Sequence, residues 1–174
     1  MPILQTQRLR LRQLTAEDAP FVLKLVNDPS WLQYIGDRGV RNLEDARHYI
    51  LNGPVESYRV RGFGLYLVEL EGAKIPIGLC GLIKRPELED VDLGFALLPE
   101  FTGKGYALEA AAAVLEQGHA ALGIDRIVAI ATPGNERSIR LLEKLGFRFE
   151  RMIAFPPKGE RLKLFASHGS KVEK

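Results

Sequence analysis

The stretch GFALLPEFTGKGYALEA, residues 94–110, places two glycines and a lysine where an apolar segment gives way to a helical pattern. Gly103 and Gly105 lack a Cβ, so backbone N–H groups beside them can approach a ligand closely. The first turn of a helix leaves four N–H groups unpaired and carries about half a positive charge. Lys104 adds a full charge. The pattern favours a phosphate or pyrophosphate site, although a plain strand-to-helix turn would use the same residues.

This stretch does not match two well-known phosphate-binding motifs. A Walker A loop needs four residues between its first glycine and a Gly-Lys-Ser/Thr sequence, and a dinucleotide fingerprint needs Gly or Ala where Leu108 stands. The dinucleotide loop also belongs to the first strand–helix unit of a domain, whereas several predicted strands precede residue 103. We therefore expect no nicotinamide cofactor.

The surrounding segments narrow the interpretation. Pro99 ends the preceding strand, and Gly94 within that strand is typical of a bulge or a close backbone approach. A second strand and helix, IVAIATPGNERSIRLLEKLGF, follow at residues 127–147. Together these features resemble the GNAT acetyltransferase superfamily, over nearly the whole chain.

Three segments are similar to the branch of that superfamily that acetylates N-terminal alanine or serine of ribosomal proteins. They are TQRLRLRQLTAEDA at residues 6–19, GKGYALEA at 103–110 and NERSIRLLEKLGF at 135–147. The resemblance implies an α/β (α+β) fold in one N-acetyltransferase domain, residues 1–174, with about 169–174 as a frayed polar tail. It implies a mixed sheet of about seven strands with a splayed parallel pair, flanked by about four helices.

The resemblance also implies acetyl-CoA as the cosubstrate. Thr102, Gly105 and Ala107 occupy the family's pyrophosphate motif, Gln/Arg-x-x-Gly-x-Gly/Ala, and Thr102 departs from it by lacking a long side chain. The backbone of the strand before the loop would receive the pantetheine arm and the thioester carbonyl. The expected cofactor-binding residues are Phe95, Ala96, Leu97, Thr102, Gly103, Lys104, Gly105, Tyr106, Ala107 and Asn135.

Acetyl transfer to an amine needs a base for the amine, donors for the developing oxyanion and, in some enzymes, a proton for the thiolate. The resemblance places Asn135 against the pantetheine and Ser138 near the thioester sulfur; alternatively, Asn135 is only a helix N-cap and Ser138 only a small inward residue. Many family members carry a tyrosine that acts as the general acid at the position held here by Leu142. A leucine cannot donate a proton. Ser138 or a bound water must then substitute.

Asp92, two residues before Gly94, is the predicted base, because several family members carry an acidic residue there. Glu89, Asp90 and deprotonation through water are alternatives for the base. In the other interpretation Asp92 is only a surface carboxylate at the edge of a strand. Glu109, one turn beyond Gly105, is expected to support the helix dipole.

The elements that must position these residues follow from hydrophobic periodicity and capping signals. We expect Thr15, Asn42 and Asn135 to be N-caps, and Gly146 to end its helix in the left-handed (αL) conformation. The predicted strands are 3–14, 62–70, 75–84, 91–98, 123–132, 147–155 and 160–167, and the predicted helices run from Thr15 to about 27–30, from 42 to 52–54, from 104 to 122 and from 135 to 146. Trp31 and Tyr34 fall in a loop that either forms an aromatic wall for the acceptor or plugs the core.

Composition sets the remaining limits. The chain has 174 residues with 46% hydrophobic and 26% charged residues, and its formal charge is 24 − 22 = +2. Neither nucleic acid nor a membrane is expected as a partner, and the chain should be a cytoplasmic monomer or homodimer. Cys80 is the sole cysteine and a predicted core residue, and His48, His119 and His168 lack metal-ligand spacing, so no metal is expected.

Four functions compete at this point. The first is an acetyl-CoA-dependent N-acetyltransferase acting on a protein or peptide N-terminal α-amine. The second keeps the cosubstrate but acetylates a small amine. The third is a catalytically silent acyl-CoA-binding module, and the fourth is a phosphate-binding regulatory domain.

Overall fold

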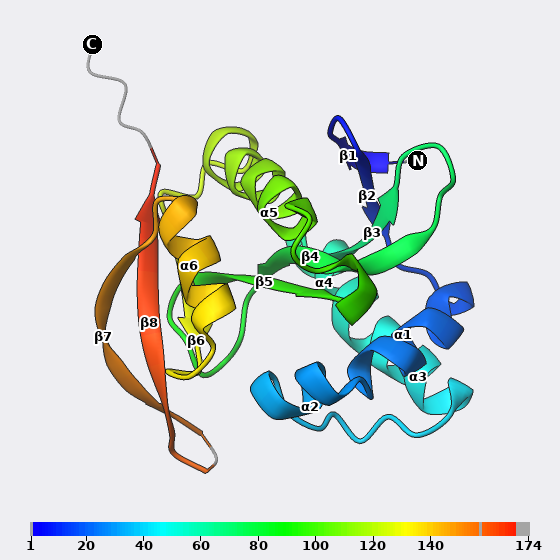
Figure 1. Cartoon of the computed structure of the whole chain (residues 1–174), viewed down its shortest axis with the longest axis horizontal. Helices are drawn as coiled ribbons and strands as arrows, with labels where there is room; N and C mark the ends of the chain where they lie inside the picture. The colour runs from blue at the N-terminus through cyan, green and yellow to red at the C-terminus, as the bar shows by residue number, and fades with distance from the viewer. Residues whose placement is uncertain (1, 157, 170–174) are drawn as a thin grey trace.

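An eight-stranded mixed sheet organises the molecule, in the order β1-β2-β3-β4-β5-β6-β8-β7 (Figure 1). The computed structural model describes residues 2–156 and 158–169; the predicted tail lies outside them, apart from residue 169. The strands are β1 (Pro2–Gln5), β2 (Leu9–Gln13), β3 (Leu65–Leu70), β4 (Pro76–Ile83), β5 (Val91–Leu97), β6 (Arg126–Ala131), β7 (Arg148–Phe155) and β8 (Glu160–His168).

Helices cover both faces of this sheet. The α-helices are α1 (Ala19–Val26), α2 (Pro29–Tyr34), α3 (Leu43–Ile50), α4 (Glu56–Arg61), α5 (Tyr106–Glu116) and α6 (Glu136–Lys144). Short 3-10 turns are η1 (Ala16–Asp18) and η3 (Pro99–Phe101), and π-helical turns are η2 (Leu51–Val55) and η4 (Gln117–Ala121). No helix within residues 2–156 and 158–169 is long and apolar enough to cross a membrane.

The sheet splits between its two central parallel strands. β5 and β6 pair only at Val91 with Ile127 and at Asp92 with Val128. From Leu93 onward β5 pairs with β4 alone, while β6 continues along β8. Figure 1 shows β5 diverging from β6, so the expected splayed parallel pair is present.

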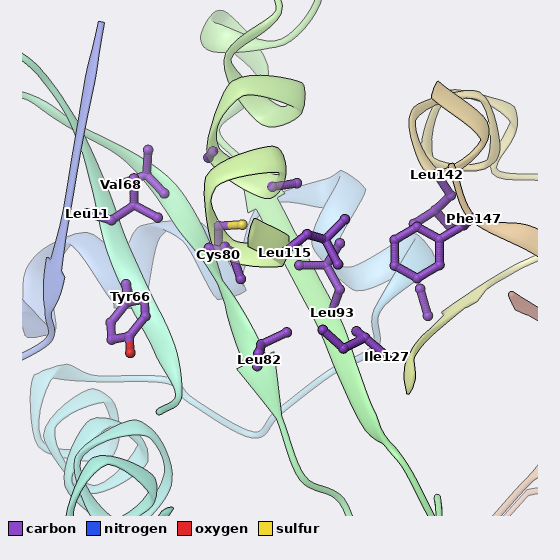
Figure 2. Close-up of a cluster of buried hydrophobic side chains, with 14 of the residues drawn as sticks. Leu11, Tyr66, Val68, Cys80, Leu82, Leu93, Leu115, Ile127, Leu142 and Phe147 are labelled. Atoms are coloured by element: carbon purple, nitrogen blue, oxygen red, sulfur yellow. The ribbon is translucent and has the colours of Figure 1, made fainter. Parts of the chain in front are cut away.

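Side chains along the central strands point alternately to the two faces of the sheet and form a hydrophobic core on each face. On β3 and β4, Tyr66, Val68, Cys80 and Leu82 belong to a cluster that includes α5 and α6, whereas Leu67 and Leu79 on the same strands belong to the cluster formed with α1 and α3. This period of two is what a strand buried on both faces requires. Figure 2 shows the first cluster, with Cys80 beneath α5. Cys80 is 1% exposed, which confirms its placement in the core.

The three expected N-caps are confirmed, and a helical segment starts directly after each of them. Thr15 accepts from the N–H of Glu17 and forms a capping box with Asp18. The side-chain oxygens of Asn42 and Asn135 accept from the N–H groups three residues on. Gly146 has the left-handed conformation expected of a stop, with φ +90°.

Three local expectations are wrong. Residues 3–14 form not one strand but the hairpin β1–β2, because the hydroxyl of Thr6 accepts from the N–H of Leu9 and turns the chain. Asp28 caps the helix α2 in a segment predicted as loop. The helix that starts at Asn42 does not end near Pro54, because the chain widens there into the π-helical turn η2, which relieves the usual clash of an internal proline.

Candidate active site

A cleft of about 1990 Å³ opens where β5 and β6 separate. Pockets for one small ligand usually measure about 300–1000 Å³, so this cleft has room for two ligands side by side. Its walls come from β5, the loop before α5, the start of α6 and the segment from α2 to α4. Except for Lys104, every predicted site residue lines it: Asp92, Phe95, Ala96, Leu97, Thr102, Gly103, Gly105, Tyr106, Ala107, Asn135 and Ser138.

The open edge of β5 forms the floor of this cleft. Beyond Asp92 this edge has no strand partner within the part of the chain that the structure describes, so backbone N–H and C=O groups that face β6 are available to a ligand. The ladder with β4 runs without a bulge at Gly94; a Cβ there would lie 2.9 Å from Cδ1 of Ile83. The bulge interpretation of Gly94 is therefore wrong, and the atoms nearest to that Cβ belong to side chains rather than to the backbone.

The glycine loop brings the start of α5 to one end of the cleft. Gly103 and Gly105 have φ of +75° and +83°, which L-residues with a side chain rarely adopt. Gly105 is the N-cap of α5 and supplies no side-chain cap, so the first N–H groups of the helix stay available. The hydroxyl of Thr102 donates to the carbonyl of Pro99 (2.8 Å). The hydroxyl of Thr102 is thus engaged within the loop, which leaves mainly backbone groups for a ligand.

Arg8, in the turn between β1 and β2, contacts both this loop and the helix that follows it. Sequence analysis did not predict these contacts. Nε of Arg8 donates to Oε1 of Glu109 (2.8 Å), and its Nη1 donates to the carbonyl of Lys104 (3.0 Å). The same carboxylate accepts from the backbone N–H of Arg8 (3.0 Å) and the hydroxyl of Thr6 (2.5 Å). Partial burial acts to raise the pKa of Glu109, but these hydrogen bonds outweigh it and hold the pKa below its usual value. The β1–β2 turn therefore fixes the loop through Glu109.

Helix α6 brings Asn135 and Ser138 to the cleft. The side-chain oxygen of Asn135 accepts from the backbone N–H of Ser138 at 3.3 Å, so Asn135 is an N-cap that also lines the cleft. Leu142 is 1% exposed and packs in the core beside Phe147 (Figure 2). Leu141 lines the cleft instead. Neither leucine can donate a proton, and Ser138 is the only hydroxyl of the helix.

Asp92 lies at the last paired position before the strands separate. It is fully buried, and both carboxylate oxygens accept from Nε of Arg85, at 3.1 and 3.2 Å. Burial raises the pKa of Asp92 above its usual value, and the charge of Arg85 opposes that shift. Its role as base stays a prediction, but an oxygen that already accepts from Arg85 is poorly placed to accept a proton from an amine.

Aromatic residues line the other end of the cleft. Trp31 is 6% exposed and belongs to the core cluster of α1 and α3, which favours the core-plug interpretation, whereas Tyr34 is 36% exposed. The hydroxyl of Thr132, just after β6, donates to the carbonyl of Tyr34 at 3.4 Å, so the end of α2 reaches the β6 side of the cleft. Tyr49 of α3 also lines this end, and burial raises its pKa.

A split sheet, with a glycine-rich helix start at one end of the cleft and an open strand edge along its floor, is the arrangement expected of the acetyltransferases that the sequence resembles. Residues 8–148 match the family model for the acetyltransferase (GNAT) domain. The chain is also 31% identical over 153 residues to the uncharacterized N-acetyltransferase YoaA of Bacillus subtilis, covering 87% of this chain and 86% of that protein. This chain belongs to the GNAT acetyltransferase family.

Two further relatives differ in their acceptors. Spermidine N(1)-acetyltransferase of Escherichia coli is 27% identical over 146 residues, covering 82% of this chain and 74% of that protein. RimL, a ribosomal L7/L12 α-N-protein acetyltransferase solved in complex with coenzyme A, superposes with a TM-score of 0.83, covering 97% of this chain and 98% of that one. At 18% identity, this last likeness shows the fold alone.

Proposed function

We propose that this acetyltransferase transfers the acetyl group of acetyl-CoA to the N-terminal α-amine of a protein or peptide. The observation that carries the proposal is the meeting of two unpartnered backbone surfaces in one cleft: the start of α5 at Gly105 and the edge of β5 beyond Asp92. The first suits a pyrophosphate and the second an extended pantetheine arm.

The chain's own groups would divide the work as follows. N–H groups from Gly103 to Ala107 hold the pyrophosphate, and the edge of β5 at Phe95, Ala96 and Leu97 orients the arm. Acetyl-CoA supplies the activated acetyl group as a thioester. Asn135 fixes the start of α6, and Ser138 donates a hydrogen bond to the departing sulfur.

Two routes remain for the proton of the amine. Asp92 is the predicted base, and water in the open cleft is the alternative. The pairing of Asp92 with Arg85 favours water, since both carboxylate oxygens are already engaged. On this route the amine enters unprotonated or loses its proton to solvent before attack.

A small-amine acceptor is the second candidate, favoured by the likeness to spermidine N(1)-acetyltransferase. We prefer the peptide because the cleft extends beyond the thioester position along α2, α3 and α4. A peptide in extended conformation can occupy such a groove, whereas a small amine would leave much of it to water.

Thiol release from acetyl-CoA, measured with a chromogenic disulfide in the presence of single acceptors, tests the proposal. We expect release with short peptides bearing a free α-amine and none with the same peptides already N-acetylated. Mass spectrometry should locate the new acetyl group on the α-nitrogen. Coenzyme A binding without transfer to any acceptor would instead indicate a silent acyl-CoA-binding module, and no coenzyme A binding would refute the site.

A further inference from the structure

The pairing of Asp92 with Arg85 engages only one edge of the arginine guanidinium. Arg85 uses only Nε toward Asp92, and neither of its Nη groups forms a hydrogen bond with the described part of the chain. Its side chain is 21% exposed and lines the cleft, and its guanidinium carbon lies 5.9 Å from the ring centre of Phe155. A buried carboxylate therefore holds one edge of the guanidinium while the other edge stays available.

Two other hydrogen-bond donors at this end of the cleft have no partner among the described residues. Arg38 lines the cleft and forms no ion pair with any of them. The indole N–H of Trp31, another lining residue, is buried and has no hydrogen-bond partner in the described chain. Burial raises the pKa of Tyr49, and the charges of Arg38 and Arg85 both oppose that shift.

The acidic side chains from α2 to α4 that line the cleft are already engaged. Asp37 pairs with Arg41, and Glu56 pairs with Arg59. Asp28 and Asp45 accept from backbone N–H groups, at 3.0 Å in each case. Glu87, whose charge reaches Asp92, does not line the cleft. On this wall Asp37 and Glu56 are paired with arginines, whereas Asp28 and Asp45 each accept through one oxygen only.

We propose that the acceptor carries a carboxylate close to its reacting amine, and that Arg85, oriented by Asp92, binds this carboxylate through its free Nη edge. This inference rests on the proposed acetyl transfer and names the acceptor class. An arginine fork matches a carboxylate with two parallel hydrogen bonds, which neither an amide nor an ammonium group can replace. For a peptide, the carboxylate is that of an acidic residue next to the N-terminal residue. A polyamine offers no carboxylate for Arg85 to bind.

Matched acceptors test the inference directly. Three C-terminally amidated peptides, identical except for Glu, Gln or Lys at the second position, isolate the carboxylate. We expect kcat/KM to be at least about tenfold higher for the Glu peptide than for the Gln peptide, or 1.4 kcal/mol. Free serine beside serine amide tests whether an α-carboxylate serves instead, and spermidine tests the polyamine. Equal rates with Glu and Gln peptides, or a preference for the Lys peptide or spermidine, would overturn the inference.

Variants assign the preference to the pair. In the double variant Arg85→Gln/Asp92→Asn, which leaves no buried charge behind, the Glu-to-Gln ratio should fall to about one. Arg47→Gln, an exposed change on α3 outside the cleft, removes the same charge and should keep the ratio. A ratio that survives in the double variant would refute a role for Arg85.

Asp92→Asn alone separates a positioning residue from a base. If Asp92 orients Arg85, the Glu-to-Gln ratio of kcat/KM falls in this variant, because KM rises for the Glu peptide and not for the Gln peptide. A uniform loss of kcat on all peptides, with the ratio intact, would make Asp92 the base and overturn its positioning role.

The inference can also be judged without turnover. Calorimetry of the N-acetylated Glu and Gln peptides against the protein saturated with coenzyme A measures the same preference at equilibrium. Tighter binding of the Glu peptide supports the inference even if no acceptor is acetylated, in which case the proposed function alone fails. Equal binding of both peptides overturns the inference.

Discussion

Gly105→Ala should separate the two consequences of adding a side chain to the glycine loop. The φ of +83° at Gly105 imposes on any L-residue a cost of about 1–2 kcal/mol. The new Cβ would lie 3.2 Å from Nη2 of Arg8, so the guanidinium would have to shift by a few tenths of an ångström against its hydrogen bonds to Glu109 and Lys104, which adds a small further cost. In addition, the methyl group would occupy space beside the N–H groups at the start of α5. We therefore expect a stability loss of about 1–2 kcal/mol and at least a tenfold, or ~1.4 kcal/mol, loss of coenzyme A affinity.

Gly123→Ala is the matched control. Gly123 also has a positive φ, +67°, a Cβ there would meet nothing within 4 Å, and the residue does not line the cleft. Both variants should lower Tm by about 2–8 °C, since 1 kcal/mol corresponds to about 2–4 °C in a chain of this size. Only Gly105→Ala should weaken coenzyme A binding in calorimetry. Unchanged affinity in folded Gly105→Ala, or an equal loss in both variants, would refute the assignment of this loop to the pyrophosphate.

Three further outcomes are expected. Ser138→Ala should slow kcat about ten- to a hundredfold while the dissociation constant of acetyl-CoA stays within about twofold; intact turnover in steady-state kinetics would make Ser138 a packing residue. Cys80 should resist alkylation at pH 8 in the native protein and react after denaturation, because burial raises its pKa to about 12; rapid native labelling, read by mass spectrometry, would contradict this. Glu109→Gln should be less stable than the parent at pH 7, because a carboxyl whose pKa is lowered by folding stabilises the folded state only while it is ionised. The difference between the chemical denaturation midpoints of the two proteins should close as pH falls below about 4.3. A difference that stays constant with pH would exclude ionisation of Glu109 as its cause.

The elements that sequence predicted well are those whose signals are local. The N-caps at Asn42 and Asn135 each require one side chain and the N–H three residues on, and both are visible in the printed sequence. The same holds for the glycine loop, whose two positive φ values follow from residue type and from the change of periodicity around it. The splayed strands were expected through the family resemblance and are confirmed by the pairing of β5 with β6.

The contacts that sequence could not supply are distant along the chain or depend on packing direction. Arg8 lies 101 residues from Glu109, and nothing in either segment indicates that the two meet. Arg85 follows β4 in a loop without periodicity, so its approach to Asp92 depends on how that loop folds back. The exposure of Asp92 was likewise open, because residue type alone does not distinguish a surface carboxylate from one buried beneath an arginine.

The buried pair leads to a last prediction, on the pH dependence of acetyl transfer. A general base must be able to take the proton of the amine. Burial raises the pKa of Asp92, which by itself would favour a base, but both of its oxygens already accept from Arg85, so neither is free for that proton. If water removes the proton, the rise of kcat/KM with pH follows the amine itself, with a midpoint near 7.7–8.0 for an ordinary α-amine. The midpoint should then shift with the acceptor, falling for peptides whose first residue lowers the pKa of the α-amine. A midpoint that stays fixed across acceptors of different amine pKa, and that moves in Asp92→Asn, would refute this reasoning and restore Asp92 as the base.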